Sequence, residues 1–458
     1  MTHEVLRRRL GSPDSDGKPW DRGGERRPGQ DAFGGRFPQW VRSEASTANP
    51  FQRFFRRTRC RSTIGAVKLT HGAHLAYCPN LHRGRDWAET LSSLEQHTLA
   101  VRRRVAPGRP YAIGLRLSDL ASRELAQPGA LRAFQEWLRR HDCYVFTING
   151  FPYGAFHGTR VKEQVSQPDW TSPDRLAYTN RLFDLLSELT PPGVEGSVST
   201  VPVSFKQFKL GERGLRTARE NLWRCVDHQE QLARRTGKKF HLGLEPEPFG
   251  TVENSTEFLT LFEQLESDRP GDLRLREHLG VNYDTCHFAL QYEVPAEAFG
   301  RLRRRGVKVS KLHLSNALRV HPTAEVRTAL HAFLDTVYFH QVIERRTDGE
   351  LVRYLDLDEA LATPESDGPQ FDREWRIHFH VPLHAPETPL FGTTVEHLRG
   401  TLDVLKQQPA LCHHLEMETY TWEVLPRELK QPRVEDMLVS EYQWTLAELA
   451  RRGFNLVG

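Results

Sequence analysis

Cysteine is scarce in this chain: six are scattered over 458 residues, and no two of them form a C-x-x-C pair. This spacing favours neither a disulfide framework nor a zinc ribbon, and it predicts reduced thiols. Long apolar runs are also missing, since none approaches the roughly 20 residues that a membrane-spanning helix requires. The basic run Arg7–Arg9 leads directly into Gly-Ser-Pro-Asp, without the apolar stretch of a signal peptide. We therefore expect a cytoplasmic protein without a membrane span.

Nucleotide-binding and nucleophile motifs are missing as well. No Gly-rich fingerprint follows any predicted strand, and we find neither a nucleophile elbow nor a basic-aromatic stripe. We therefore expect no NAD, ATP or RNA partner. The chain is 38% hydrophobic and 27% charged, which is enough to bury a large core without disulfides or a structural metal.

Positive charge is unevenly distributed along the chain. Of the 63 Lys and Arg and the 59 Asp and Glu, 14 basic and 7 acidic residues lie within residues 1–66. The remaining 49 basic and 52 acidic residues give residues 67–458 a net charge of −3. Gly, Pro, Ser, Asp and Arg dominate the first segment without a regular period, so residues 1–66 predict a disordered basic tail. The slightly acidic remainder disfavours a nucleic-acid partner and suits a small-molecule site.

From Val67 onward, short apolar runs alternate with segments of helical period. The predicted strands are His74–Cys78, Tyr111–Leu117, Tyr144–Asn149, Gly196–Val201, Phe240–Glu245, Leu279–Asp284, Val307–Leu314, Trp375–Val381 and His413–Glu418. The predicted helices include Trp87–Val105, Leu131–Arg140, Arg175–Leu189, Arg213–Thr236, Ser255–Leu265 and Thr394–Gln407. Such sustained alternation favours an α/β fold, a (β/α)8 TIM barrel formed by residues 67–458 as a single domain.

Nine strand candidates compete for eight places in the barrel. Trp375–Val381 is the weakest of them, because it follows an unusually long connection, residues 318–374. That connection contains a helical pattern over Glu325–Val342 and a polar Pro-rich patch. A long excursion of this kind is more typical of a lid or a binding insertion than of an idle loop. We therefore expect an insertion before the last barrel strand.

Four consecutive strand ends carry side chains that bind metals. In chain order they supply Glu245, Asp284 with His287, His313, and finally a glutamate of the last strand, where Glu416 and Glu418 share one face with His414. The carboxyl ends of barrel strands face the active site, so we expect these groups to converge. Burying them is costly unless an ion compensates their charge. Carboxylate oxygens mixed with imidazole nitrogens suit Zn²⁺, Mn²⁺, Fe²⁺ or Co²⁺ better than Ca²⁺.

Two loops at the same end are candidate substrate contacts. The loop after the third strand reads Asn-Gly-Phe-Pro-Tyr-Gly-Ala-Phe-His and includes Asn149, Phe151 and Tyr153. Its aromatic rings predict either a platform for a sugar or planar ligand, or a packed plug of the barrel mouth. Asn80 and His82, which follow the first strand, are further candidates for contacts at the rim.

The order of the strand-end motifs resembles that of the xylose isomerase-like TIM-barrel superfamily, over roughly residues 67–425. This superfamily includes sugar epimerases, inosose dehydratase-like enzymes and apurinic endonucleases of the endonuclease IV type. Longer stretches look like the EboE family, the "metabolite traffic" proteins of bacterial ebo gene clusters. They are Thr70-His-Gly-Ala-His-Leu-Ala-Tyr-Cys, Phe146-Thr-Ile-Asn-Gly-Phe-Pro-Tyr-Gly-Ala-Phe-His, Gly196-Ser-Val-Ser-Thr-Val-Pro, Phe379-His-Val-Pro-Leu and Leu415-Glu-Met-Glu-Thr-Tyr-Thr-Trp.

The resemblance to the superfamily implies a set of metal ligands. They would be Glu245, Asp284, His313 and Glu416, with His287 beside the metal or on a second ion and His380 as a further ligand. The multi-zinc endonucleases have an Asp-x-His pair before the last strand, where this chain reads His378-Phe-His380. This departure disfavours a faithful trinuclear zinc site.

The leading functional hypothesis is a metal-dependent isomerase or epimerase acting on a small polyhydroxylated or carbonyl metabolite. Glu245 and Glu416 would exchange protons with opposite faces of a carbon, and His287 and His157 would carry protons to the oxygens. One alternative is a zinc-dependent phosphoesterase of the endonuclease IV type. The other is a non-catalytic metabolite-binding or carrier protein in a biosynthetic and export pathway, with partner proteins encoded in the same cluster.

Overall fold

The computed structural model of the protein describes residues 68–154, 162–335, 337–364, 373–425 and 430–457. The predicted tail, residues 1–66, lies outside these ranges, and so does His157. Within the described ranges, no helix combines the length and the apolarity needed to span a bilayer.

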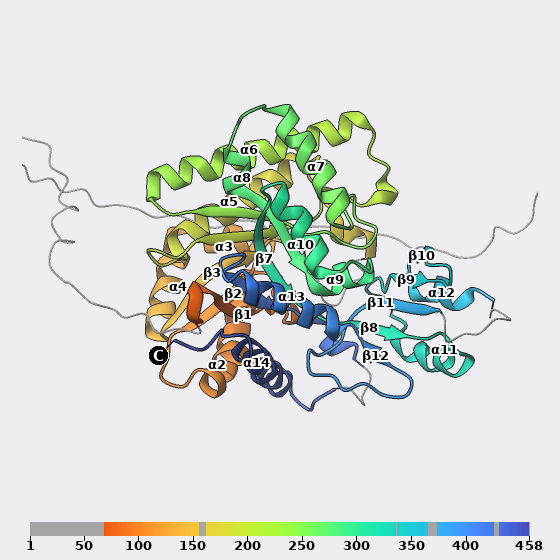
Figure 1. Ribbon diagram of the computed structural model, residues 1–458. Helices are drawn as coiled ribbons and strands as arrows, with labels where there is room; N and C mark the ends of the chain where they lie inside the picture. Colours follow the sequence, from red (N-terminus) through yellow and green to blue (C-terminus); the bar gives the residue numbers. More distant parts are fainter. Residues whose placement is uncertain (1–67, 155–161, 336, 365–372, 426–429, 458) are drawn as a thin grey trace, which may run out of the picture. The chain divides into compact units, whose positions relative to one another are not determined.

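The centre of the molecule is a sheet of eight strands (Figure 1). Its members are β1 (His74–Tyr77), β2 (Tyr111–Arg116), β3 (Cys143–Asn149), β4 (Gly196–Thr200), β5 (Phe240–Leu244), β6 (Leu279–Asp284), β7 (Lys308–Leu314) and β13 (His414–Met417). Every ladder in it is parallel, and the strand order is β1-β13-β7-β6-β5-β4-β3-β2. The end strands β1 and β2 contact each other, which nearly closes the barrel. The predicted (β/α)8 barrel is therefore confirmed.

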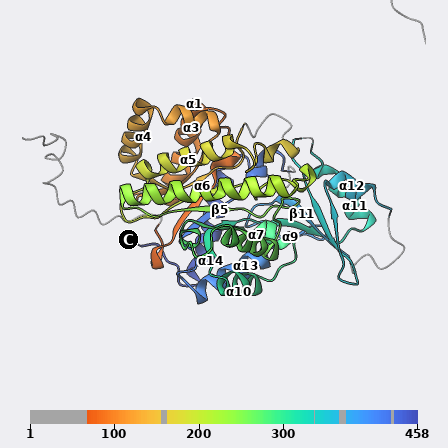
Figure 2. The same ribbon diagram turned by 90° about the horizontal axis from the view of Figure 1, so that it is seen from above.

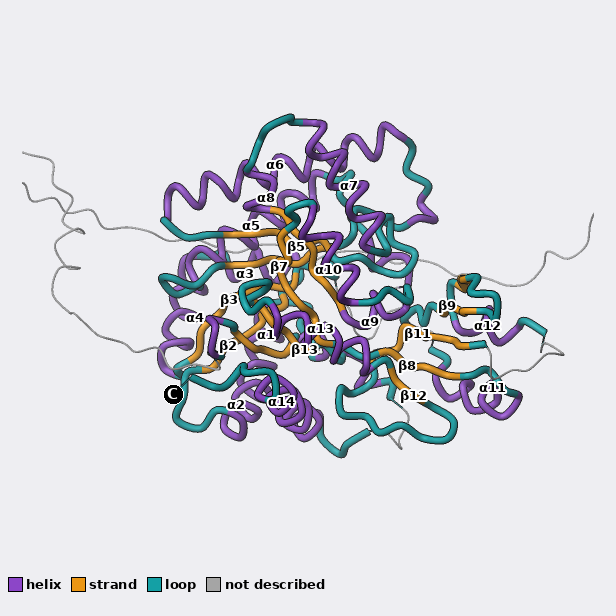
Figure 3. The backbone as a smooth tube through the Cα atoms, viewed as in Figure 1, coloured by secondary structure: helices purple, strands orange, loops and turns teal. Residues whose placement is uncertain are grey.

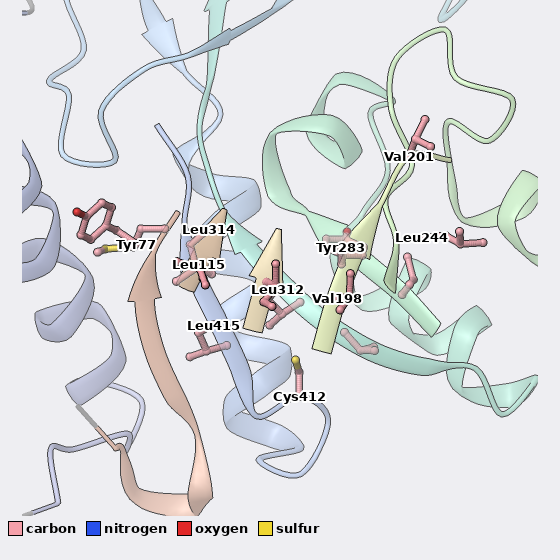
Figure 4. Packing of buried hydrophobic residues seen from close by; sticks show 14 of the residues in the cluster. Tyr77, Leu115, Val198, Val201, Leu244, Tyr283, Leu312, Leu314, Cys412 and Leu415 are labelled. Carbon is pink, nitrogen blue, oxygen red and sulfur yellow. The ribbon is translucent and has the colours of Figure 1, made fainter. Parts of the chain in front are cut away.

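The two faces of each barrel strand have different chemistry. On β7, Leu312 and Leu314 pack in the hydrophobic core, and Leu312 lies beside Leu415 of β13 in the ladder that joins the two strands (Figure 4). A fully buried leucine of this kind stabilises the fold by about 1.5–3 kcal/mol. The alternate residues of the same strand, such as Lys311, point into the barrel, because successive side chains of a strand face opposite sides. The outer face therefore stabilises the barrel, while the inner face is left for polar groups.

Helices surround the strands (Figure 2). They are α1 (Trp87–Ser93), α2 (Leu99–Val105), α3 (Asp119–Leu125), α4 (Pro128–Arg140), α5 (Pro173–Leu189), α6 (Glu212–Thr236), α7 (Ser255–Asp268), α8 (Arg274–His278), α9 (Thr285–Leu290), α10 (Pro295–Arg304), α13 (Val395–Gln407) and α14 (Val434–Ala450). A π-helical stretch, Leu94–Thr98, joins α1 to α2 within the predicted helix Trp87–Val105. Side-chain caps begin several of them: Asn254, for example, accepts hydrogen bonds from the first amides of α7.

A second, antiparallel sheet lies between β7 and β13 in the chain (Figure 3). Its order is β10-β9-β11-β8-β12, and its strands are β8 (Ala317–Val320), β9 (Val342–Arg345), β10 (Leu351–Tyr354), β11 (Glu374–His380) and β12 (Gly392–Thr393). The predicted strand Trp375–Val381 corresponds to β11, so its place outside the barrel is confirmed. Two short helices lie between its strands in the chain: α11 (Ala324–Leu330) follows β8, and α12 (Leu357–Ala362) follows β10.

The predicted helix over Glu325–Val342 is wrong in its length. The α-helix ends at Leu330, a 3-10 turn covers His331–Phe333, and Val342 begins β9. From Val342 onward the chain pairs with β11, and β-branched residues such as Val342 and Ile343 favour this extended backbone. The insertion is therefore a sheet that reaches the barrel, since β11 contacts α9.

Candidate metal centre

Four strand ends bring acidic and imidazole side chains to one point. Glu245 follows β5, Asp284 ends β6, His313 lies near the end of β7 and Glu418 follows β13. Their nearest donor atoms all lie within 4.8 Å of one another, and all four side chains are buried. We refer to these four residues as the mouth group.

His313 is at the centre of the mouth group. Its Nδ1 lies 2.9 Å from Glu245 Oε1, 3.0 Å from Glu418 Oε2 and 3.7 Å from Asp284 Oδ2. One imidazole nitrogen thus faces three carboxylates. This is the arrangement in which a single divalent ion would meet all four side chains.

Asp284 has one oxygen engaged and one open. Its Oδ1 accepts hydrogen bonds from the backbone amides of Cys286 and His287 and from the Ser315 hydroxyl, so it caps α9. Its Oδ2 is buried and finds no hydrogen-bond partner among the described residues. An unpartnered buried carboxylate oxygen is costly, and a cation would satisfy it.

The electrostatics of the mouth group also fit a cation. Burial raises the pKa of Glu418, and Glu245 and Asp284 raise it further, against the lowering effect of His313. Burial likewise raises the pKa of the neighbouring Glu247 well above its usual range. Burial also opposes ionisation of Asp284, but the imidazoles of His287 and His313 outweigh it and hold its pKa well below the usual range. Carboxylates crowded in this way repel one another, and a bound divalent ion would relieve that repulsion.

Glu416, a predicted ligand, lies one layer deeper in the barrel. It pairs with His313 in the ladder between β13 and β7, so Glu418 projects beyond it toward the mouth. Its Oε2 lies 2.7 Å from Lys311 Nζ and 3.1 Å from His313 Nε2. Burial alone would raise the pKa of Glu416, but Lys311 and His313 lower it to about 2. The structure thus brings Glu418, rather than Glu416, into the mouth group.

A second set of donors adjoins the first. His287 Nε2 lies 3.0 Å from His378 Nε2, and His378 belongs to β11 of the second sheet. Overlapping donor groups join His287 and His378 with Glu247, and His287 and His380 with Asp284. His380 uses Nδ1 toward the backbone oxygen of Glu418, whereas its buried Nε2 finds no partner in the part of the chain that the structure describes. A second ion would therefore have imidazole ligands available.

A pocket of about 80 Å³ opens above these groups. One wall is aromatic and consists of Phe151, Tyr338, Phe339 and Tyr420. The wall residue Lys162 is ion-paired with Asp356, at 2.6 Å between Nζ and Oδ2. The pocket thus has acidic and imidazole side chains at its bottom and apolar side walls, with a few polar groups that could orient a ligand.

Of the remaining predicted substrate contacts, some line the pocket and others lie away from it. Phe151 and Asn80 line the pocket, and Asn80 Nδ2 donates to Glu418 Oε1 at 2.6 Å. His82 points elsewhere, since it is bonded to the Tyr77 hydroxyl and stacked on His97. Asn149 is buried and bonded to Cys78, Phe151 and Ser199, and Tyr153 packs against Tyr178 and Arg175.

The structure places here three donors that the predicted ligand set leaves out: Glu247, His378 and Glu418. Glu418 shares a strand face with Glu416, and Glu247 follows Glu245 in the motif Glu-Pro-Glu-Pro. His378 shares the His-Phe-His motif with His380. The signal for each was an acidic or imidazole side chain two positions from a predicted ligand, on the same face of its strand.

No protein family model and no curated protein sequence matches the chain. Among solved structures, the IolI protein with a bound zinc atom is 12% identical, covers 82% of this chain and 98% of its own, and has a TM-score of 0.43. A D-tagatose 3-epimerase-like protein is 11% identical, with 83% and 98% covered and a TM-score of 0.43. A xylose isomerase-like TIM-barrel protein from Mycobacterium smegmatis in complex with magnesium is 13% identical, with 85% and 97% covered and a TM-score of 0.44.

Proposed function

We propose that the protein is a metal-dependent isomerase or epimerase that acts on a small polyhydroxylated or carbonyl-containing metabolite. The observation that carries this proposal is the convergence of Glu245, Asp284, His313 and Glu418 at the carboxyl ends of barrel strands. Active sites of barrel enzymes lie at this end. The Oδ2 atom of Asp284, which has no hydrogen-bond partner among the described residues, adds a ligand oxygen that lies 3.7 Å from His313 Nδ1.

The mouth group would hold one divalent ion of the Zn²⁺, Mn²⁺, Fe²⁺ or Co²⁺ type. A bound ion of this kind supplies Lewis acidity, which polarises a carbonyl and makes the adjacent C–H acidic. The mixed donor set, three carboxylates and one imidazole, is the feature that supports this choice.

Two carboxylates are placed to move the proton. Glu245 and Glu418 both line the pocket, and they come from strands on either side of β7. One would remove a proton from carbon and the other would return it to the opposite face, with the pKa of each set by its surroundings. In this proposal Glu418 replaces Glu416, because Glu416 lies beneath His313 and is ion-paired there.

Two further groups would serve the substrate oxygens. Glu247 lines the pocket, and its raised pKa leaves it a proton to donate to an oxygen. His287 also lines the pocket and is held by Pro246 O at 3.0 Å, so its position is fixed for proton transfer. The role of His157, and service in an EboE-type metabolite traffic pathway with partner proteins, stay predictions from the sequence.

The proposal is tested by metal content. Asp284→Asn removes a negative ligand while keeping the shape of the side chain, and we expect it to lose bound metal in elemental analysis of protein purified in parallel with the wild type. Asp169→Asn is the matched control, because Asp169 is a buried aspartate that bonds Thr171 and Ser204 away from the mouth. Unchanged metal content in Asp284→Asn would contradict the site. A metal-loaded protein that binds small metabolites without converting any would favour a carrier instead.

A phosphoesterase is the second candidate, and the adjoining imidazoles favour it. His287 and His378, with Glu247 or with His380 and Asp284 nearby, could hold another ion next to the first. Two adjacent ions would clamp a phosphate and activate water. This candidate predicts more than one metal per chain, together with release of phosphate from simple phosphoesters. A metal content near one per chain would argue against it.

A further inference from the structure

A buried ion pair lies directly beneath the mouth group. Lys311 of β7 and Glu416 of β13 both have no exposed side-chain surface. Lys311 Nζ donates to Glu416 Oε2 at 2.7 Å and to the Ser199 hydroxyl of β4 at 3.1 Å. Neither residue lines the pocket above. The pair therefore sits where no substrate reaches it, yet in contact with the centre of the site.

His313 links the ion pair to the mouth group through its two ring nitrogens. His313 directs Nδ1 toward the three carboxylates of the mouth group, and Nε2 toward Glu416 Oε2 at 3.1 Å. Glu416 is ion-paired with Lys311, so its oxygen is a hydrogen-bond acceptor. Nδ1 also faces carboxylate oxygens, so without a metal both ring nitrogens can carry protons. When an ion replaces the proton on Nδ1, the proton on Nε2 stays bonded to Glu416.

The barrel also makes room for this carboxylate. A Cβ atom on Gly114 of β2 would lie 1.7 Å from Glu416 Oε1, so glycine alone permits the observed position. Glu416 Oε1 itself is buried without a hydrogen-bond partner among the described side chains and backbone. All the bonding of Glu416 passes through Oε2, which contacts both Lys311 and His313.

We propose that Glu416 and Lys311 form a positioning pair that fixes His313 in its Nε2–H tautomer and directs Nδ1 at the metal. The proposal rests on the metal site of the proposed function. A carboxylate behind a ligating imidazole orients the ring and raises its basicity. Lys311 keeps that carboxylate charged and in place, so the metal site depends on a residue two strand positions below its own ligand.

Two other roles for the pair must be separated from this one. Glu416 would be a direct ligand if the sequence prediction held in the metal-loaded protein. Alternatively, the pair would be only a structural ion pair, and apolar side chains of similar size would then replace it without effect on metal binding.

Three variants distinguish these roles by the dissociation constant for Zn²⁺, measured by chelator competition. Glu416→Gln keeps an acceptor oxygen where Oε2 lies but removes the charge that raises the basicity of His313, so we expect an affinity at most about tenfold weaker than that of the wild type. The double variant Lys311→Met, Glu416→Leu removes the pair without leaving an unpaired buried charge, and we expect an affinity about 10–100-fold weaker. Gly114→Ala should displace Glu416 and weaken the affinity in the same direction. Glu344→Gln is the control, because Glu344 is a fully buried, ion-paired glutamate of the second sheet.

A second readout reports the tautomer itself. In the zinc-loaded wild type, ¹⁵N NMR of labelled histidine should show a proton on His313 Nε2, with the signal assigned through its loss in His313→Gln. The Glu416→Gln variant should keep this proton protected from exchange, and the double variant should lose the protection.

Each result decides between the roles. A loss of affinity in Glu416→Gln as large as that in Asp284→Asn would overturn the proposal in favour of a direct ligand. Wild-type affinity in a folded double variant would overturn it in favour of a structural pair. Either result leaves the proposed function intact, whereas a wild-type chain that binds no Zn²⁺ would overturn both proposals.

Discussion

The two ends of the barrel interior use histidine in opposite ways. At the mouth, His313 is surrounded by carboxylates, and its pKa lies well above the usual range because Glu418 and Glu245 outweigh the lowering effect of burial. At the other end lie His74, His241 and His414, which we call the floor histidines. Burial lowers the pKa of His74 and of His241 to about 4, and that of His414 well below its usual value.

Each floor histidine has a hydroxyl partner. His74 Nδ1 lies 2.7 Å from the Tyr144 hydroxyl, and His414 Nδ1 lies 2.7 Å from Ser197 Oγ. His241 Nδ1 lies 2.6 Å from Ser310 Oγ. A hydroxyl can donate to or accept from a neutral imidazole. His241 Nε2 also lies 3.5 Å from Glu195 Oε2, but burial outweighs this carboxylate and keeps the pKa of His241 low.

The two layers differ in how far the protein itself satisfies their polar groups. In the floor, hydroxyls and Glu195 partner the imidazoles. The mouth, in contrast, crowds carboxylates together and keeps buried oxygen and nitrogen atoms without a hydrogen-bond partner among the described residues. This agrees with the general division of barrels into a stabilising end and a catalytic end.

Lowering the pH should destabilise the protein, because the floor histidines become protonated. An unfolded chain protonates His74 and His241 near pH 6.5, whereas the folded chain resists until about pH 4. Their full contribution is therefore present above pH 6.5 and is lost as the pH falls to about 4. With a shift of this size, each histidine accounts for on the order of 3 kcal/mol of the free energy of unfolding. Urea unfolding at several pH values should show the loss, and His241→Gln should flatten it; a parallel pH profile in that variant would contradict this explanation.

Removing a carboxylate from the mouth should abolish most metal binding. Glu418→Ala takes away an oxygen 3.0 Å from His313 Nδ1, and we expect the affinity for Zn²⁺ to fall more than about 100-fold, beyond the range typical of residues behind the ligands. Chelator competition measures the change. Equal losses in Glu418→Ala and in the control Glu344→Gln would show that the effect is not local to the mouth.

Replacing a floor histidine should lower the stability of the fold without weakening metal binding. His414→Gln removes a buried imidazole bonded to Ser197, and we expect it to destabilise the fold by about 1–3 kcal/mol, the cost of an unsatisfied buried group. The affinity for Zn²⁺ should stay within about twofold of the wild type, since His414 lies below the positioning pair and outside the mouth group. A variant that is stable but has lost its metal would break the distinction between the two ends.

The strands of the barrel could be predicted from the sequence, but the exact members of the mouth group could not. All nine predicted strands exist, because buried parallel strands read as short apolar runs bounded by helices and turns. The choice between Glu416 and Glu418 was beyond it, since a period of two places both on one face. Depth in the barrel is set by register, and register appears only in the pairing of Glu416 with His313.

The second sheet was the other part that the sequence could not place. Its polar insertion could be recognised by length, yet the antiparallel pairing of β11 with β8 and β9 depends on contacts far apart in the chain. That pairing directs the end of β11, with His378 and His380, to the mouth. The helix predicted over Glu325–Val342 failed for the same reason, because strand pairing outweighed the local helical pattern at Val342.

The smallest effect concerns Asn80, predicted from the sequence as a substrate contact. Its Nδ2 donates to Glu418 Oε1 at 2.6 Å while Glu418 Oε2 faces His313, so Asn80 holds a carboxylate of the mouth group from behind. Asn80→Ala should therefore weaken the affinity for Zn²⁺ about tenfold, the lower end of the effect of such partners. Asn221→Ala, which removes a buried amide bonded to Trp170 O, is the control. An unchanged affinity in Asn80→Ala would show that Asn80 does not position Glu418, and it would favour the predicted role of Asn80 as a substrate contact.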